Sequence, residues 1–306
     1  MQTLRTADER FVGLPGYAFE PHYADFGPLR VHYLDEGAKT GPVALCLHGQ
    51  PTWVYLYRKM IPALLAAGYR VIAPDLFGFG RSDKPVDEDV YTFDFHRSAI
   101  ISLIEALDLR HIMLVCQDWG GLIGLTIPMD VPGRFERLLV MNTTLGTGDV
   151  PLGEGFLAWR AFSNRSPDMD IAALMKRALP DLREAEAAAY AAPFPDARYK
   201  AGVRRFPNLV PDRTDADGAA LSRRARVFWS KAWTGMLHGS GHERPGNRAA
   251  GDDGSRSGYS ELSVAARTSR SRTFRTGGRR DHCKGGDEEL RFNALKQSLA
   301  SHSAPR

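Results

Sequence analysis

The chain has 306 residues, enough for one large α/β domain with an insertion. Its three cysteines lie far apart without a CxxC pair, so neither a disulfide framework nor a zinc site is indicated. The first ten residues lack the apolar core of a signal peptide, and no apolar run approaches the roughly 18 residues of a membrane span. We therefore expect a cytoplasmic protein without membrane contact, cofactor or metal.

The positive charge of the chain is confined to its C-terminal part. Residues 236–306 carry 13 Lys+Arg and 8 Asp+Glu, whereas residues 1–235 carry 27 and 28. The body of the chain is thus nearly neutral, and the basic isoelectric point gives no reason to expect a nucleic-acid partner.

Apolar strand patterns alternate with helical patterns through the first half of the chain. This alternation predicts a mostly parallel sheet covered by helices on both faces. The strands are expected at 29–34, 42–47, 70–73, 111–116 and 137–142, and the helices at 55–67 and 93–107.

A segment rich in Ala, Pro and Arg interrupts this alternation from about residue 147 to residue 220. It contains helical patterns at 171–179 and 182–192, and we interpret it as a helical cap inserted after the sixth strand. A helix over about 217–233 is expected to return to the sheet. The predicted division is a core of 1–146, a cap of 147–220, a return helix within 221–235 and a tail of 236–306.

The most informative segment is Gln117-Asp-Trp-Gly-Gly121, which lies between an apolar strand and an apolar helical stretch. Such a strand–turn–helix holds the nucleophile of α/β-hydrolases between small residues, here Cys116 and Gly120. The nucleophile position holds a carboxylate, Asp118, which can displace a leaving group from saturated carbon and form an ester. The segment therefore indicates alkyl rather than acyl transfer. The alternative is an ordinary aspartate that caps the following helix.

Several further motifs accompany this turn in the same order as in a known family. With them, residues 1–235 resemble a haloalkane dehalogenase of the α/β-hydrolase fold, most closely the subgroup whose type member degrades 1,2-dichloroethane. The motifs are His48-Gly-Gln-Pro-Thr-Trp53, Tyr55-Leu-Tyr-Arg58, Ala73-Pro-Asp-Leu-Phe-Gly-Phe-Gly-Arg-Ser-Asp-Lys-Pro85, Gln117-Asp-Trp-Gly-Gly121, Gly155-Phe-Leu-Ala-Trp159, and Ala192-Pro-Phe-Pro-Asp196 with Tyr199, Gly202 and Phe206-Pro207.

The resemblance implies a mechanism and a set of site residues. Asp118 would displace halide in line and form an alkyl ester, with the backbone N–H groups of Gln50 and Trp119 in the oxyanion hole. The indole N–H groups of Trp119 and Trp159 would bind halide, because they donate without a competing acceptor; a plain core anchor is the alternative for Trp159. His48 would shape the oxyanion loop rather than act as a base. The apolar pocket wall would consist of Phe156, Phe206, Pro207 and Val210.

The resemblance further implies a small haloalkane substrate, with water and halide as the other participants, a primary alcohol as product, and a monomer. An epoxide hydrolase is the nearest alternative, since it shares the aspartate turn and would use cap tyrosines such as Tyr190 and Tyr199. A degenerate, non-catalytic protein that binds apolar ligands, or whose tail binds acidic partners, is the third.

The tail departs from the family, because its catalytic acid and its histidine, usually in a Gly-His-Phe segment, are not recognisable. Large apolar residues make up only 10 of the 71 residues from 236 onward, so we expect a disordered tail without a strand. Advancing the reading frame by one base permits Gly-His-Phe-Val-Pro from residues 272–276 and family-like segments from 236–247 and 281–290. We interpret the tail as a frameshift beginning near Gly235, which leaves nothing to hydrolyse the ester. The histidines that lack the family context are His238, His242, His282 and His302, and the alternative is an acid–base pair of Asp252 or Asp253 with His282.

Overall fold

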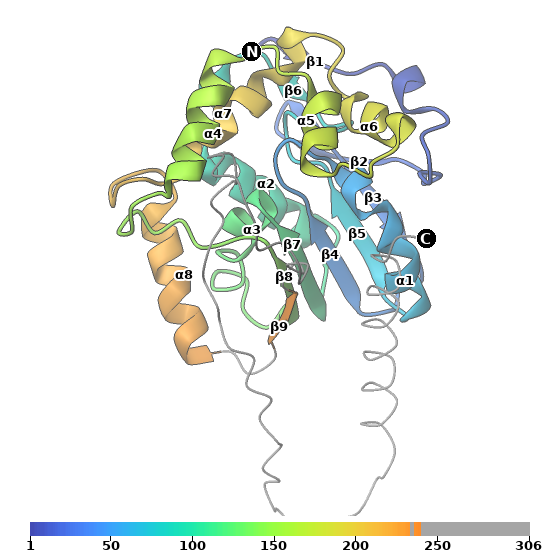
Figure 1. The fold of residues 1–306 in the computed structure, drawn as a ribbon. Helices are drawn as coiled ribbons and strands as arrows, with labels where there is room; N and C mark the ends of the chain where they lie inside the picture. Colours follow the sequence, from blue (N-terminus) through green and yellow to red (C-terminus); the bar gives the residue numbers. More distant parts are fainter. Residues whose placement is uncertain (233–235, 240–306) are drawn as a thin grey trace, which may run out of the picture.

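The computed structural model describes residues 1–232 and 236–239. Within them, a sheet of seven strands runs in the order β2-β3-β5-β4-β7-β8-β9 through the centre of the molecule (Figure 1). The pairs β2–β3 and β3–β5 are antiparallel, and the remaining pairs are parallel. The predicted mostly parallel sheet is confirmed. The strands are β2 (His22–Phe26), β3 (Leu29–Glu36), β4 (Val43–Leu47), β5 (Arg70–Pro74), β7 (Ile112–Gln117), β8 (Phe135–Met141) and β9 (Met236–Gly239).

The two central strands consist almost entirely of buried residues. All five residues of β4 are buried, as are the first five of β7. A strand covered on both faces needs an apolar run rather than an alternating pattern, which explains why these segments read as continuous apolar stretches. The sheet is flanked by α1 (Ile61–Ala66), α2 (Phe93–Ala106), α3 (Trp119–Gly124) and α8 (Ala219–Ala232).

The single helix predicted over 55–67 is divided in the structure. A 3₁₀ helix, η2 (Val54–Lys59), precedes α1 (Ile61–Ala66). Pro62 lies in the first turn of α1, where a missing backbone N–H costs nothing, but it cannot continue a helix that began before it. The helix predicted over 93–107 forms as α2, whose first turn is capped by Thr92.

The cap consists of short helices that lie over one end of the sheet (Figure 1). The helices predicted at 171–179 and 182–192 form and pack against each other. Arg160 joins a second pair of cap helices, the one that contains it and the one that ends at Leu209, by donating to the carbonyl oxygens of Pro207 and Val210, each at 2.9 Å. The cap elements are α4 (Glu154–Arg165), α5 (Ile171–Ala178), α6 (Glu184–Ala191), η4 (Ala197–Lys200) and α7 (Ala201–Leu209).

The expectation of no strand after residue 235 is wrong for four residues. Met236–Gly239 forms β9, parallel to β8, with Leu138 opposite Met236 and Met141 opposite Gly239. Pairing uses backbone groups that an edge strand offers to any neighbouring chain, so the polar composition of the tail did not reveal it. The rest of the tail, 240–306, lies outside the described residues, as do the predictions made for it.

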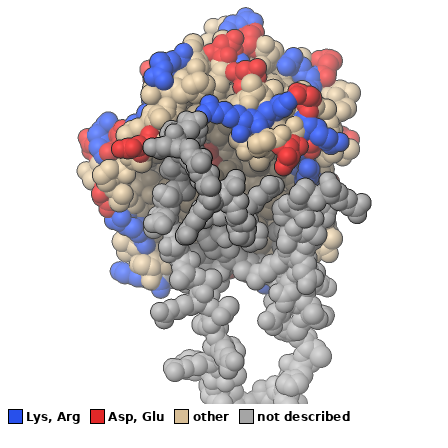
Figure 2. Space-filling model, viewed as in Figure 1, with Lys and Arg blue, Asp and Glu red and all other residues tan. Residues whose placement is uncertain are grey.

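Neither the helices nor the surface charges of the described residues indicate a membrane span or a one-sided charged face in the view shown. No helix among the described residues is both long and apolar enough to cross a membrane. On the face shown in Figure 2, Lys and Arg side chains lie next to Asp and Glu side chains over the described part of the molecule.

Candidate active site

Asp118 lies at the sharp turn between β7 and α3, as predicted from the sequence. Its φ of 52° and ψ of −125° are unusual for a residue with a side chain, and such conformations cost about 1–3 kcal/mol unless the surroundings impose them. Here the surroundings do: the Asp118 N–H donates to Asn142 O at 3.2 Å, and Asp118 O accepts from Thr143 Oγ1 at 2.7 Å. The end of β8 therefore holds the turn on both sides of the nucleophile position.

Three glycines make the close approaches of this turn possible. A Cβ atom on Gly120 would lie 1.9 Å from Leu47 O, and one on Gly121 would lie 2.2 Å from the Thr143 side chain. A Cβ atom on Gly49 would lie 2.3 Å from Asp118 Cβ. The predicted requirement for a small residue at position 120 agrees with this geometry. The requirement at Gly121 and the role of Thr143 were missed, although the glycine pair and the position after a parallel strand could have indicated both.

The loop after β4 supplies the backbone donor to the carboxylate. Because β4 and β7 are parallel neighbours, their carboxyl ends lie together, and the Gln50 N–H donates to Asp118 Oδ1 at 2.8 Å. Trp119, whose N–H is the other predicted donor, follows Asp118 directly as the first residue of α3. The Gln50 side chain extends the other way and donates to Val203 O of α7 at 3.1 Å.

His48 contacts the backbone of this loop and of the loop after β5, which agrees with the role that the resemblance implies. Its Nδ1 lies 2.9 Å from Gly49 O, and its Nε2 accepts the Leu76 N–H at 2.9 Å. Nδ1 therefore carries the proton, and both ring nitrogens are occupied by backbone groups. Burial lowers the pKa of His48, which favours this neutral form.

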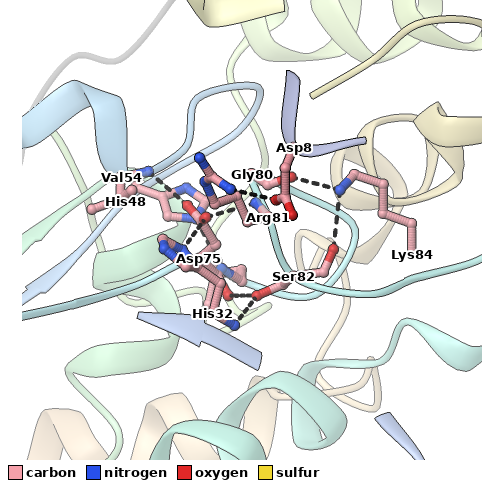
Figure 3. A network of polar contacts seen from close by, with 10 residues as sticks. Asp8, His32, His48, Val54, Asp75, Gly80, Arg81, Ser82 and Lys84 are labelled. Carbon is pink, nitrogen blue, oxygen red and sulfur yellow. Dashed lines mark hydrogen bonds and ion pairs between the residues drawn. The ribbon is translucent and has the colours of Figure 1, made fainter. Parts of the chain in front are cut away.

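A buried polar network centred on Asp75 adjoins His48 and the end of this loop at Val54 (Figure 3). Asp75 accepts from the N–H groups of Val54 and Arg81, both at 2.8 Å, and pairs with His32 Nδ1 at 2.7 Å. Burial acts to raise the pKa of Asp75, but His32 and the hydrogen bonds outweigh it, and the pKa lies below its usual value. Lys84, also buried, donates to Gly80 O and Ser82 O, and burial lowers its pKa to about 7.

Aromatic side chains of α7 and the core form the apolar part of the site. Phe206 is fully buried, and its ring centroid lies 4.7 Å from that of Trp119 and 4.8 Å from those of Phe79 and His96. Of the other predicted wall residues, Phe156 on α4 and Pro207 on α7 are buried, whereas Val210 at the end of α7 is half-buried.

The four tryptophans within 1–232 differ in how their indole N–H groups are used. Trp53 donates to Ala189 O at 3.1 Å and Trp229 donates to Leu125 O at 2.9 Å. Within the described part of the chain, the indole N–H groups of Trp119 and Trp159 make no hydrogen bond. Trp119 is buried against Phe206, while Trp159 is half-buried on α4, and no ring contact joins these two indoles among the described residues.

The remaining predicted groups are placed less directly. Tyr190, on α6, accepts a hydrogen bond from Arg58 at 3.2 Å. The backbone of His238 lies in β9, and the other histidines and acids proposed from the tail are outside the described residues. Among the described residues, no group of three or more His, Cys, Asp or Glu side chains is arranged to hold a metal ion.

The sheet, the turn at Asp118 and the inserted cap define an α/β-hydrolase, and a family model of the alpha/beta hydrolase fold matches residues 42–235. A haloalkane dehalogenase of Psychrobacter cryohalolentis is 50% identical over 240 residues, which cover 76% of this chain and 79% of the relative. One of Mycolicibacterium paratuberculosis is 45% identical over 246 residues, 77% of this chain and 78% of the relative. The chain belongs to the haloalkane dehalogenase family, whose members are hydrolases acting on carbon–halide bonds.

A solved structure leads to the same family. The haloalkane dehalogenase DpaA of Paraglaciecola agarilytica NO2 is 50% identical, with a TM-score of 0.75, over 78% of this chain and 82% of DpaA. DpaA is described as tetrameric, which does not agree with our expectation of a monomer.

Proposed function

We propose that this site dehalogenates haloalkanes through an alkyl ester on Asp118, and that the chain as written stops at that ester. The observation that carries the proposal is the carboxylate at the strained turn, with Oδ1 held by the Gln50 N–H at 2.8 Å. A carboxylate oxygen of Asp118 forms a bond to the halogen-bearing carbon while the halide leaves from the opposite side with the bonding electron pair.

The leaving halide needs hydrogen-bond donors, because the aromatic wall around Phe206 keeps water away from it. Trp119 and Trp159 are the candidates, since their indole N–H groups are the ones without an acceptor in the described part of the chain. Trp53 and Trp229 donate to backbone carbonyls and are not available. The buried rings of Phe156, Phe206 and Pro207 supply the apolar surface that a haloalkane requires.

Hydrolysis of the ester needs a base that activates water, and the histidines of residues 1–232 do not serve. Both nitrogens of His48 are engaged, His32 pairs with Asp75, and burial lowers the pKa of His96 to about 3. His111 precedes β7, so the length of that six-residue strand, about 20 Å, separates it from Asp118. His22 lies on β2, at the far edge of the sheet. A base would therefore have to come from beyond residue 232, where we infer that a frameshift near Gly235 removed the histidine and the acid of the family.

Dehalogenation is favoured over epoxide opening because the relatives that are 50% and 45% identical are haloalkane dehalogenases. We further propose a cytoplasmic location, supported by two free, buried cysteines, Cys46 and Cys116, within the described residues.

Halide release and protein mass together test the proposal. With excess bromoalkane, the chain as written should release one bromide per protein, and peptide mapping should place the added alkyl group on Asp118. Asp118→Asn should release none. A version with the reading frame corrected near codon 235 should turn over repeatedly. Repeated turnover by the chain as written, abolished by His282→Ala, would disprove the missing base; an adduct elsewhere with Asp118 unmodified would disprove the nucleophile.

A further inference from the structure

A cavity outside the site around Asp118 lies where the cap meets the core. It has a volume of about 460 Å³, within the range of small-molecule sites. Its walls come from the N-terminal segment, from η2 and α1, and from the start of α6. The lining residues are Pro15, Gly16, Arg58, Lys59, Pro62, Ala63, Ala66, Arg183 and Glu186.

The charges in this cavity do not balance. Arg58, Lys59 and Arg183 all contact the same carboxylate, Glu186, at 2.6, 3.4 and 3.1 Å. Three cations thus share one anion, and these four side chains leave two positive charges in excess. Hydrogen bonds from Arg183 and Arg58 overcome the opposing effect of burial and lower the pKa of Glu186 to about 2, so its charge persists throughout the physiological range.

The geometry separates a fixed part of the cavity from an adjustable part. The Arg58 and Glu186 side chains are only 4% and 5% exposed, whereas those of Lys59 and Arg183 are 59% and 73% exposed. The buried pair anchors the floor, and the two exposed cations are able to turn toward a ligand. Arg183 immediately precedes α6, and Glu186 lies in the first turn of that helix.

We propose that this cavity binds a phosphate monoester of a small molecule. A phosphate dianion matches the excess of two positive charges, and Arg and Lys donors bind phosphate through charge-assisted hydrogen bonds. The volume exceeds the need of the phosphate group alone. Pro15, Pro62, Ala63 and Ala66 provide apolar surface for the carbon part of the ester.

Because the cations come from both parts of the molecule, a bound ester joins them. Arg58 and Lys59 belong to η2 beside the sheet, and Arg183 precedes the cap helix α6. Occupancy therefore holds the cap against the core at a place away from Asp118, and binding does not depend on the alkylation chemistry.

Calorimetry on the full chain at constant ionic strength tests the proposal with glycerol 3-phosphate, inorganic phosphate and glycerol. Glycerol 3-phosphate should bind saturably and more tightly than inorganic phosphate, and glycerol should not bind. Arg183→Ala and Lys59→Ala should each weaken binding about tenfold, the effect of one lost charge-assisted hydrogen bond. Arg110→Ala is the matched control, because that arginine is also exposed and ion-paired but lies outside the cavity.

Each outcome decides the matter. An absence of saturable binding, or equal affinity of the Arg183→Ala and Arg110→Ala variants, would overturn the site. Binding of inorganic phosphate that equals or exceeds that of the ester would overturn the assignment of a carbon body to the apolar wall. Far-UV circular dichroism of each variant separates lost binding from lost folding.

Discussion

His96 should make the stability of this protein fall as the solution becomes acidic. The side chain is fully buried on α2, stacked on Tyr91 and edge-on to Phe206, and neither ring nitrogen has a hydrogen-bond partner among the described residues. Burial, assisted by His48, lowers its pKa from 6.5 to about 3. The folded state thus accepts this proton only near pH 3, whereas the unfolded chain accepts it near pH 6.5.

The sign and size of the effect follow from this difference. Between those pH values the unfolded chain binds the additional proton, so the free energy of unfolding decreases as the pH falls. Each pH unit below about 6 should remove about 1.4 kcal/mol, and the whole interval about 5 kcal/mol. That is a large share of the roughly 5–15 kcal/mol by which domains are stable.

Urea unfolding of the wild-type chain and of His96→Phe, from pH 7 to pH 4, measures this contribution. The variant keeps an aromatic ring among aromatic neighbours and removes the proton-binding group. Its stability relative to wild type should rise by about 1.4 kcal/mol for each pH unit below 6. His111→Phe is the control, since that side chain is 70% exposed. Parallel pH profiles for wild type and His96→Phe would refute the reasoning.

Three further changes test the active site. Gly120→Ala should destabilise the chain by at least about 3 kcal/mol in urea unfolding, because Cβ would lie 1.9 Å from Leu47 O. Gly133→Ala has open space around it and should cost only about 1 kcal/mol, for the positive φ of that residue. Equal costs would contradict the steric argument. Trp159→Phe should abolish saturable quenching of tryptophan fluorescence by bromide, and Trp229→Phe should retain it; retained quenching in the former would remove Trp159 from the halide site. Thr143→Val removes the hydrogen bond to Asp118 O, so it should destabilise the fold by about 1 kcal/mol and slow the first release of bromide. An unchanged rate of that first release would show that the turn does not need this hydrogen bond.

The parts of the site that the sequence predicted are those with local signals. The turn at Asp118 is specified by neighbouring residues, an apolar strand before it and glycines after it, so its position was readable. The contacts of Arg160 with Pro207 O and Val210 O were not predictable, because these acceptors are 47 and 50 residues away and meet Arg160 only when the cap helices pack.

Two misjudged elements have different causes. Pro62 was visible in the sequence and marks the start of α1, so the division of the 55–67 helix was predictable from local chemistry. In contrast, β9 forms by pairing with the backbone of β8, and the side chains of Met236–Gly239 do not indicate that pairing.

The two ends of Gln50 connect the Asp118 carboxylate to the cap. Its backbone N–H contacts Asp118, while its side chain holds the carbonyl of Val203 on α7. We therefore expect a displacement of α7 to move this N–H relative to the carboxylate. By thermodynamic reciprocity, conversion of the carboxylate to an ester should change the energy of displacing α7. Because Gln50 bridges Asp118 and α7, a protein that carries the ester should exchange the amide hydrogens of α7 at a different rate from the unmodified protein.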